Sequence, residues 1–172
     1  MIRSTAIYRA FLLPEALEVD LGFTSASAFG ALGPGFKVIF GRVQELRPPP
    51  PPAADHLIGL AWHHVLHARV CIERGQLWQA EYWITALRDL VITLICLREG
   101  LPTIYARSAH LIPESMSERL ALTLVRNLDP QELWRSFREV TNAIREEIQR
   151  TDSVIAERLD TTLVQLQSVS TP

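Results

Sequence analysis

The sequence predicts an α+β protein that is mostly α, with a partial antiparallel sheet of about three strands followed by a four- to five-helix bundle. Three observations support this class. Apolar and polar residues alternate over residues 17–24, as in a half-buried strand, and residues 6–13 are also β-like. Five consecutive prolines occupy positions 48–52, where neither a helix nor a central strand can continue. After the prolines, apolar residues recur with the period of an α-helix.

The first part of the chain, residues 1–46, is predicted to be a β-meander. Residues 6–13 and 17–24 are expected to form two strands, because the short connection Pro-Glu-Ala between them suits a hairpin. Residues 36–41, with the sequence FKVIFG, are expected to form a third strand. Three strands alone would be marginally stable, so we expect this sheet to pack against something else.

A proline-rich linker, residues 47–54, is predicted to separate this meander from an α-helical bundle over residues 55–168. Asp55 is a plausible N-cap for the first helix, and Gly75 and Gly100 are expected to stop the first and second helices. An N-cap acid, a proline and a glutamate in the order Asp129, Pro130 and Glu132 indicate the start of the fourth. The helices are expected at residues 55–74, 77–99, 114–127, 129–150 and 153–167.

Composition limits the classes of partner. The 172 residues carry a net charge of −2, which gives no general attraction to nucleic acid or to acidic membranes. No apolar segment has the length of a membrane span, and the first residues lack the apolar core of a signal peptide, so we expect a cytoplasmic protein. Cys71 and Cys96 lie in apolar helical stretches without metal-type spacing, which indicates buried, unpaired thiols.

Two acids lie side by side in the second predicted strand. Glu18 and Asp20 are two positions apart and therefore point to the same face, where their repulsion is unfavourable. The pair is either a solvated face of an antiparallel sheet or a site that binds a cation.

Four of the five histidines lie in the first predicted helix. His63 and His67 share one stripe with His56 and Arg74, and a pair at i and i+4 can hold a metal ion. No carboxylate stands at a helical spacing that completes such a site. A polar stripe that faces a groove, or histidines bonded within the bundle, is the alternative to zinc.

The second predicted helix carries Glu81, Thr85 and Arg88 on one side of an otherwise apolar sequence. Such a helix should be central in the bundle, so the carboxylate and the guanidinium need partners. These partners are either each other or a ligand in a cleft. Four tryptophans at helical core spacings are interpreted as packing residues: Trp62, Trp78, Trp83 and Trp134.

A resemblance to a known family covers almost the whole chain. Residues 62–113 have the sequence WHHVLHARVCIERGQLWQAEYWITALRDLVITLICLREGLPTIYARSAHLIP. This segment resembles the helical part of bacterial nucleotidyltransferases of the kanamycin nucleotidyltransferase-like type. The second half of the catalytic domain in the same proteins is similar to YRAFLLPEALEVDLGFTSASAFGALGPGFKVIFG, residues 8–41. The most specific piece is the run from His67 to Asp89.

The resemblance implies a fold of the DNA polymerase β superfamily and a reaction. Three carboxylates would hold two Mg²⁺ ions, which align a nucleoside triphosphate for attack by an acceptor hydroxyl or amine. Asp20 matches the third carboxylate and would be a metal ligand. Glu81 is the candidate general base, and His63, His67, Thr85 and Arg88 are candidate substrate-binding residues. The expected product is a small molecule or protein that carries a transferred nucleotide, with AMP as the expected nucleotide.

The chain departs from the family pattern at the other two carboxylates. The Gly-Ser and Asp-x-Asp motifs do not occur before Asp20. We therefore expect a truncated or degenerate relative that is incomplete or inactive alone, and that forms a homodimer or binds a partner subunit supplying the missing half. The alternative is a non-catalytic helical-bundle module for binding or dimerisation. A third possibility is a histidine-dependent metal protein.

Overall fold

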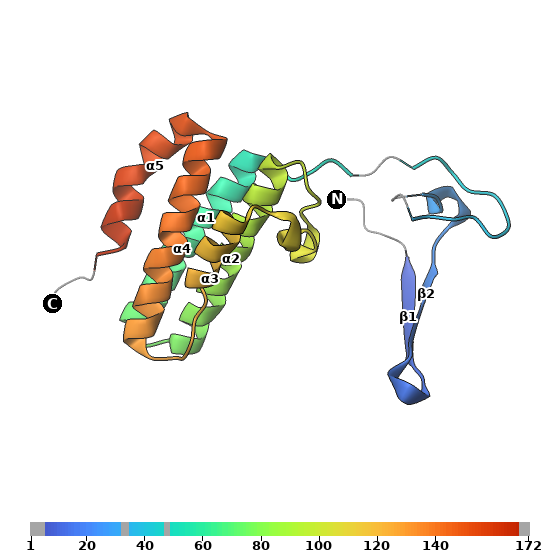
Figure 1. Cartoon of the computed structure of the whole chain (residues 1–172), viewed down its shortest axis with the longest axis horizontal. Coiled ribbons are helices and arrows are strands. Elements are labelled where there is room, and N and C mark those ends of the chain that lie inside the picture. The colour runs from blue at the N-terminus through green and yellow to red at the C-terminus, as the bar shows by residue number, and fades with distance from the viewer. Residues whose placement is uncertain (1–5, 32–34, 47–48, 169–172) are drawn as a thin grey trace. The chain divides into compact units, whose positions relative to one another are not determined.

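The computed structural model describes residues 6–31, 35–46 and 49–168, and the chain divides into two compact units, Met1–Pro50 and Pro51–Pro172. Each unit is considered by itself. The division lies within the proline run, and part of the predicted linker, residues 47 and 48, is outside the described residues. Figure 1 shows the strands of the first unit and the helices of the second.

The first unit contains an antiparallel hairpin of β1 (Ile7–Leu12) and β2 (Glu18–Phe23). The predicted third strand is wrong, because residues 36–41 pair with no neighbouring strand. Beyond the hairpin, the described part of this unit has one isolated bridge between Gly30 and Gln44. No described residue of the unit is buried. An extended segment without a ladder partner gains no inter-strand hydrogen bonds, and the described residues offer residues 36–41 no such partner.

The second unit is a bundle of α-helices, which confirms the predicted mostly-α class. Its helices are α1 (Ala54–Glu73), α2 (Leu77–Arg98), α3 (Glu114–Leu122), α4 (Pro130–Thr151) and α5 (Ser153–Leu166). Figure 1 shows α1, α2 and α4 running side by side, with α5 along α4. The third helix is shorter than predicted, since it ends at Leu122 rather than near residue 127.

Local signals set most helix ends. Gly75 and Gly100 follow α1 and α2 with φ of 68° each, a conformation that glycine adopts without steric cost. Asp129 caps α4 by accepting hydrogen bonds from the amides of residues 131 and 132. Asp152 caps α5 in the same way. The prediction for Asp55 is wrong, because its carboxylate bonds the amide of the next residue and caps no helix end.

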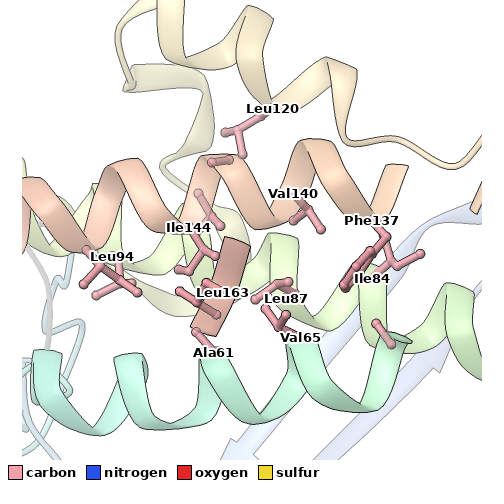
Figure 2. Packing of buried hydrophobic residues seen from close by; sticks show 14 of the residues in the cluster. Ala61, Val65, Ile84, Leu87, Leu94, Leu120, Phe137, Val140, Ile144 and Leu163 are labelled. Carbon is pink, nitrogen blue, oxygen red and sulfur yellow. The ribbon is translucent and has the colours of Figure 1, made fainter. Parts of the chain in front are cut away.

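The core is continuous through the bundle and takes side chains from all five helices. Figure 2 shows buried residues of this cluster, among them Ala61, Val65, Ile84, Leu87, Leu94, Leu120, Phe137, Val140, Ile144 and Leu163. Cys71 and Cys96 are also buried and form no disulfide, as predicted. Burial raises the pKa of both thiols, which keeps them in the unreactive protonated form.

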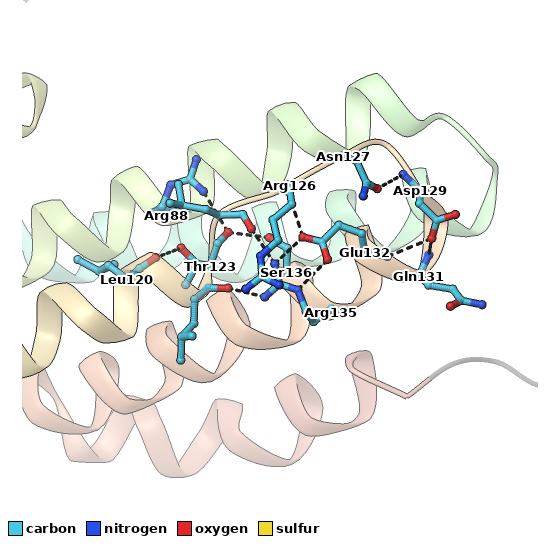
Figure 3. Close-up of polar contacts among 12 residues, drawn as sticks. Arg88, Leu120, Thr123, Arg126, Asn127, Asp129, Gln131, Glu132, Arg135 and Ser136 are labelled. Atoms are coloured by element: carbon cyan, nitrogen blue, oxygen red, sulfur yellow. Dashed lines mark hydrogen bonds and ion pairs between the residues drawn. The ribbon is translucent and has the colours of Figure 1, made fainter.

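Polar side chains fix the loop between α3 and α4 onto the bundle (Figure 3). Arg135 donates to the carbonyl of Leu122 at 2.5 Å and to that of Leu124 at 2.7 Å. Ser136 donates to the carbonyl of Thr123 at 2.6 Å. Because these acceptors are the last carbonyls of α3 and the residues after it, the bonds satisfy a helix end that would otherwise lack partners.

Glu132 holds the same loop in a way that makes stability depend on pH. Its carboxylate accepts from Arg135 at 2.6 and 2.8 Å and from the amide of Arg126 at 3.0 Å, instead of completing a capping box. The hydrogen bond from Arg135 lowers the pKa of Glu132 from 4.5 to about 2. A carboxyl with a lowered pKa in the folded state stabilises the protein above its unfolded pKa, and this contribution is lost as the pH falls.

We therefore expect the free energy of unfolding to decrease as the pH falls from 4.5 to 2. In Glu132→Gln this decrease should be smaller. Urea unfolding followed by circular dichroism at several pH values measures the effect. Arg135→Met should also reduce the decrease in stability over this pH interval. It should lower stability at neutral pH as well, because it removes the hydrogen bonds to the loop carbonyls. An equal acid slope in Glu132→Gln and in the unaltered protein would contradict the assignment.

Candidate functional site

Three candidate residues of α2 are joined by hydrogen bonds. Thr85 Oγ1 donates to Glu81 Oε1 at 2.8 Å, and Arg88 Nη2 donates to Thr85 Oγ1 at 2.7 Å. All three side chains are half-buried. The residues are spaced at i, i+4 and i+7, so one face of the helix brings them together as the sequence predicted. Thr85 relays the contact between the carboxylate and the guanidinium.

Arg88 also attaches this face to another part of the bundle. Its Nη1 atom donates to the carbonyl of Thr123 at 3.0 Å, in the loop after α3 (Figure 3). The hydrogen bonds to Glu81 within the described residues reach Oε1 and not Oε2. The carboxylate is thus oriented through one oxygen, and its second oxygen is available to accept a proton or a hydrogen bond from a ligand.

A second candidate group lies on α1. The Nε2 atoms of His63 and His67 are 3.1 Å apart, and the ring centroids are 4.3 Å apart at 80°. The ring of His67 stacks on Trp83 of α2, with centroids 4.7 Å apart and an angle of 17° between the planes. The predicted i, i+4 pair therefore forms, and a tryptophan from the neighbouring helix supports it.

His64 lies between this pair and the core. Its ring meets the ring of Trp83 at 4.8 Å, and its buried Nδ1 has no hydrogen-bond partner among the described residues. Burial lowers the pKa of His64, and the neighbouring His63 and His67 lower it further. Desolvation thus favours the neutral form of this imidazole.

The two groups do not form one site. Glu81 and Trp83 lie about 160° apart around α2. Among the described residues, no hydrogen bond or ring contact joins Glu81, Thr85 or Arg88 to the histidines. Sequence reasoning placed His63, His67 and the α2 residues in one substrate site, whereas the helices separate them.

Three hollows on the bundle lie away from both groups. The largest, about 460 Å³, is between α4 and α5, and another of about 330 Å³ lies between α1 and α5. The third, about 170 Å³, lies among α2, α3 and α4 and has Glu147 in its wall. These three hollows are lined by residues other than the predicted site residues.

Asp20 lies on β2, in the other unit. It pairs across the hairpin with Ala10, and Glu18 pairs with Leu12, so the two carboxylates share one face as predicted. Mg²⁺ commonly takes one or two protein carboxylates and completes its six positions with water and substrate phosphates. Glu18 and Asp20 supply carboxylate oxygens, the ligand type that Mg²⁺ prefers. No cluster of three ligating side chains exists among the described residues, so the two-metal arrangement of the family is not assembled by them.

Comparisons with known proteins add no relative. No protein-family model, no curated protein and no solved structure matches this chain. Within the described residues, each helix is too short or too polar to cross a membrane.

Sequence reasoning missed the partners that come from other elements. Trp83 was interpreted as a packing residue, not as the support of His67. The carbonyl of Thr123 carries no side-chain signal, so its bond to Arg88 could not be found from residue types. The burial of His64 could have been suspected, because it lies about 80° from the polar stripe on an otherwise apolar helix.

Proposed function

We propose that this chain contributes to a magnesium-dependent nucleotidyltransferase, with its bundle binding the acceptor. The reaction transfers a nucleotide from a nucleoside triphosphate to a hydroxyl or amine of a small molecule or protein. AMP is the nucleotide that we propose. Glu81 is the general base, Thr85 and Arg88 position it, and Asp20 is a metal ligand.

The observation that carries this proposal is the state of the Glu81 carboxylate. Its Oε1 is fixed by Thr85, which is fixed in turn by Arg88, and Oε2 lacks a hydrogen-bond partner among the described residues. A general base needs this combination, because it must be oriented and still have an oxygen that reaches the acceptor proton. The run from His67 to Asp89, which resembles the helical part of the nucleotidyltransferases, contains all three residues.

The proposed chemistry conserves charge and atoms. Glu81 accepts the proton as the acceptor oxygen or nitrogen attacks the α-phosphorus, and pyrophosphate leaves in line. Mg²⁺, when bound, neutralises the phosphate oxygens. Glu18 and Asp20 would hold one ion on the hairpin face.

The proposal requires two further carboxylates that these 172 residues do not supply. The sequence contains no Asp-x-Asp, so a second copy of this chain would bring no such motif. We therefore favour a polypeptide that carries the two further carboxylates over a homodimer as the source of the missing half.

Calorimetric titration with ATP in the presence and absence of Mg²⁺ tests the proposal. We expect saturable, Mg²⁺-dependent binding that is lost in Asp20→Ala and kept in Glu81→Gln. Asp20 is exposed, so its replacement should change stability by less than about 0.5 kcal/mol. An absence of binding at millimolar nucleotide would contradict the proposal and favour a non-catalytic helical binding module.

Pyrophosphate release separates the two roles once the chain is combined with the polypeptide that supplies the two further carboxylates. Glu81→Gln should lower the rate roughly 10²- to 10⁴-fold while leaving the dissociation constant for ATP unchanged. Asp89→Asn is the matched control, since Asp89 is an exposed carboxylate on the same helix. Equal losses in the two variants would exclude Glu81 as the base.

A further inference from the structure

We propose that His63 and His67 chelate a divalent transition-metal ion of the Zn²⁺, Ni²⁺ or Cu²⁺ type on the surface of α1. This site is separate from the nucleotidyltransferase proposal. It uses nitrogen ligands from one helix, while the magnesium ligands proposed above are carboxylates of the hairpin.

The separation of the two nitrogens suits a shared metal ion. His63 Nε2 and His67 Nε2 are 3.1 Å apart. A Zn–N bond is about 2.0–2.1 Å long, so two nitrogens on one ion are about 2.9 Å apart at a right angle and about 3.4 Å apart at the tetrahedral angle. The observed distance lies between these limits. An ion can therefore bind both nitrogens without a change in the helix backbone.

Neighbouring rings hold the ligands in this geometry. The stacking of His67 on Trp83 fixes the plane of one imidazole, and the edge contact with His67 orients the other. Trp62 meets His63 from the far side, with ring centroids 5.8 Å apart. Preorganised ligands lose little side-chain entropy when the metal binds, which strengthens binding.

The side chains around the pair define the kind of metal that fits. The described residues supply no third ligand, so two or more positions remain open to water or to an outside ligand. Neutral imidazole favours Zn²⁺, Ni²⁺ and Cu²⁺, with Cu²⁺ bound most tightly, and it disfavours Mg²⁺. His63 is exposed, so an ion reaches the pair directly from solvent.

The same contact could consist only of a hydrogen bond, with one Nε2 as donor and the other as acceptor. Titration of the full chain with NiCl₂ and ZnCl₂ in a calorimeter distinguishes the two cases. We expect saturable binding of one ion per chain, unaffected by excess Mg²⁺. Because two linked ligands bind much more tightly than either alone, His63→Ala and His67→Ala should each weaken binding roughly 10²-fold.

His56→Ala is the matched control, since His56 is an exposed histidine on the same stripe two turns earlier. It should leave the affinity unchanged, and circular dichroism should show that all three variants are folded. Electron paramagnetic resonance of the Cu²⁺ form should show two coupled nitrogens, reduced to one in either ligand variant. Absence of saturable binding, or an equal loss in His56→Ala, would overturn the proposal. Failure of ATP binding with retained nickel binding would reject the nucleotidyltransferase proposal alone.

Discussion

Replacing Arg98 by alanine is expected to destabilise the bundle by about 3 kcal/mol, because it leaves a buried carboxylate without its main partner. Glu147 is 1% exposed, and Arg98 reaches it with Nε at 2.7 Å and Nη2 at 3.4 Å. The hydrogen bond to Glu147 raises the pKa of Arg98, so the guanidinium is charged at every accessible pH. Arg150, at 3.5 Å, is a weaker second partner and keeps the loss at the lower end of the range for buried pairs.

Urea unfolding of Arg98→Ala measures this loss, and Arg145→Ala is the control. Arg145 pairs with Asp160, which is 54% exposed, and a solvent-exposed pair contributes about 1 kcal/mol or less. The double variant Arg98→Met with Glu147→Met should be more stable than Arg98→Ala, since it leaves no buried charge unpaired. If Arg98→Ala lowered the free energy of unfolding no more than Arg145→Ala, the Glu147 carboxylate would have to be stabilised by other groups.

Phe137→Ala is expected to cost about 3–5 kcal/mol, because the missing ring leaves a cavity in a core that cannot close fully. Phe137 is 0% exposed and lies in the buried cluster (Figure 2). It meets Trp134 edge to face, with ring centroids 5.5 Å apart. It lies on α4, a helix in contact with each of the other four, so the cavity would affect packing between several helices. Thermal and urea unfolding report the change.

The control for the cavity is Trp78→Ala. Trp78 is also a large aromatic residue on a helix, but it is 77% exposed, so its loss should change stability by no more than about 0.5 kcal/mol. Similar losses in the two variants would show that aromatic identity, and not burial, sets the cost.

The helices of the bundle could be predicted closely because short-range chemistry marks their ends. Gly75, Gly100 and Asp129 act within one turn of the residues they stop or start, so their effect is visible in the sequence. The end of α3 depends instead on Arg135 and Ser136, which bond carbonyls 11 to 13 residues away. Residue types in the loop do not reveal such bonds, and the predicted helix was too long.

The candidate sites divide in the same way. The i, i+4 contacts of His63 with His67 and of Glu81 with Thr85 follow from helix geometry alone. Whether two such groups meet depends on how the helices pack, which the geometry of one helix does not determine. The tryptophans show the same limit, because Trp62 and Trp78 have the spacing of core residues and yet are 42% and 77% exposed.

The carbonyl oxygen of Thr123 accepts hydrogen bonds from both Arg88 and Ser136, which occupies both of its lone pairs. One peptide plane therefore connects α2 and α4. A rotation of that plane would remove the anchor of Arg88, then the donor to Thr85, and finally the orientation of Glu81. The conformation of the loop after α3 thus controls the geometry of a carboxylate on another helix. A molecule that binds this loop would change the orientation of Glu81 without contacting it.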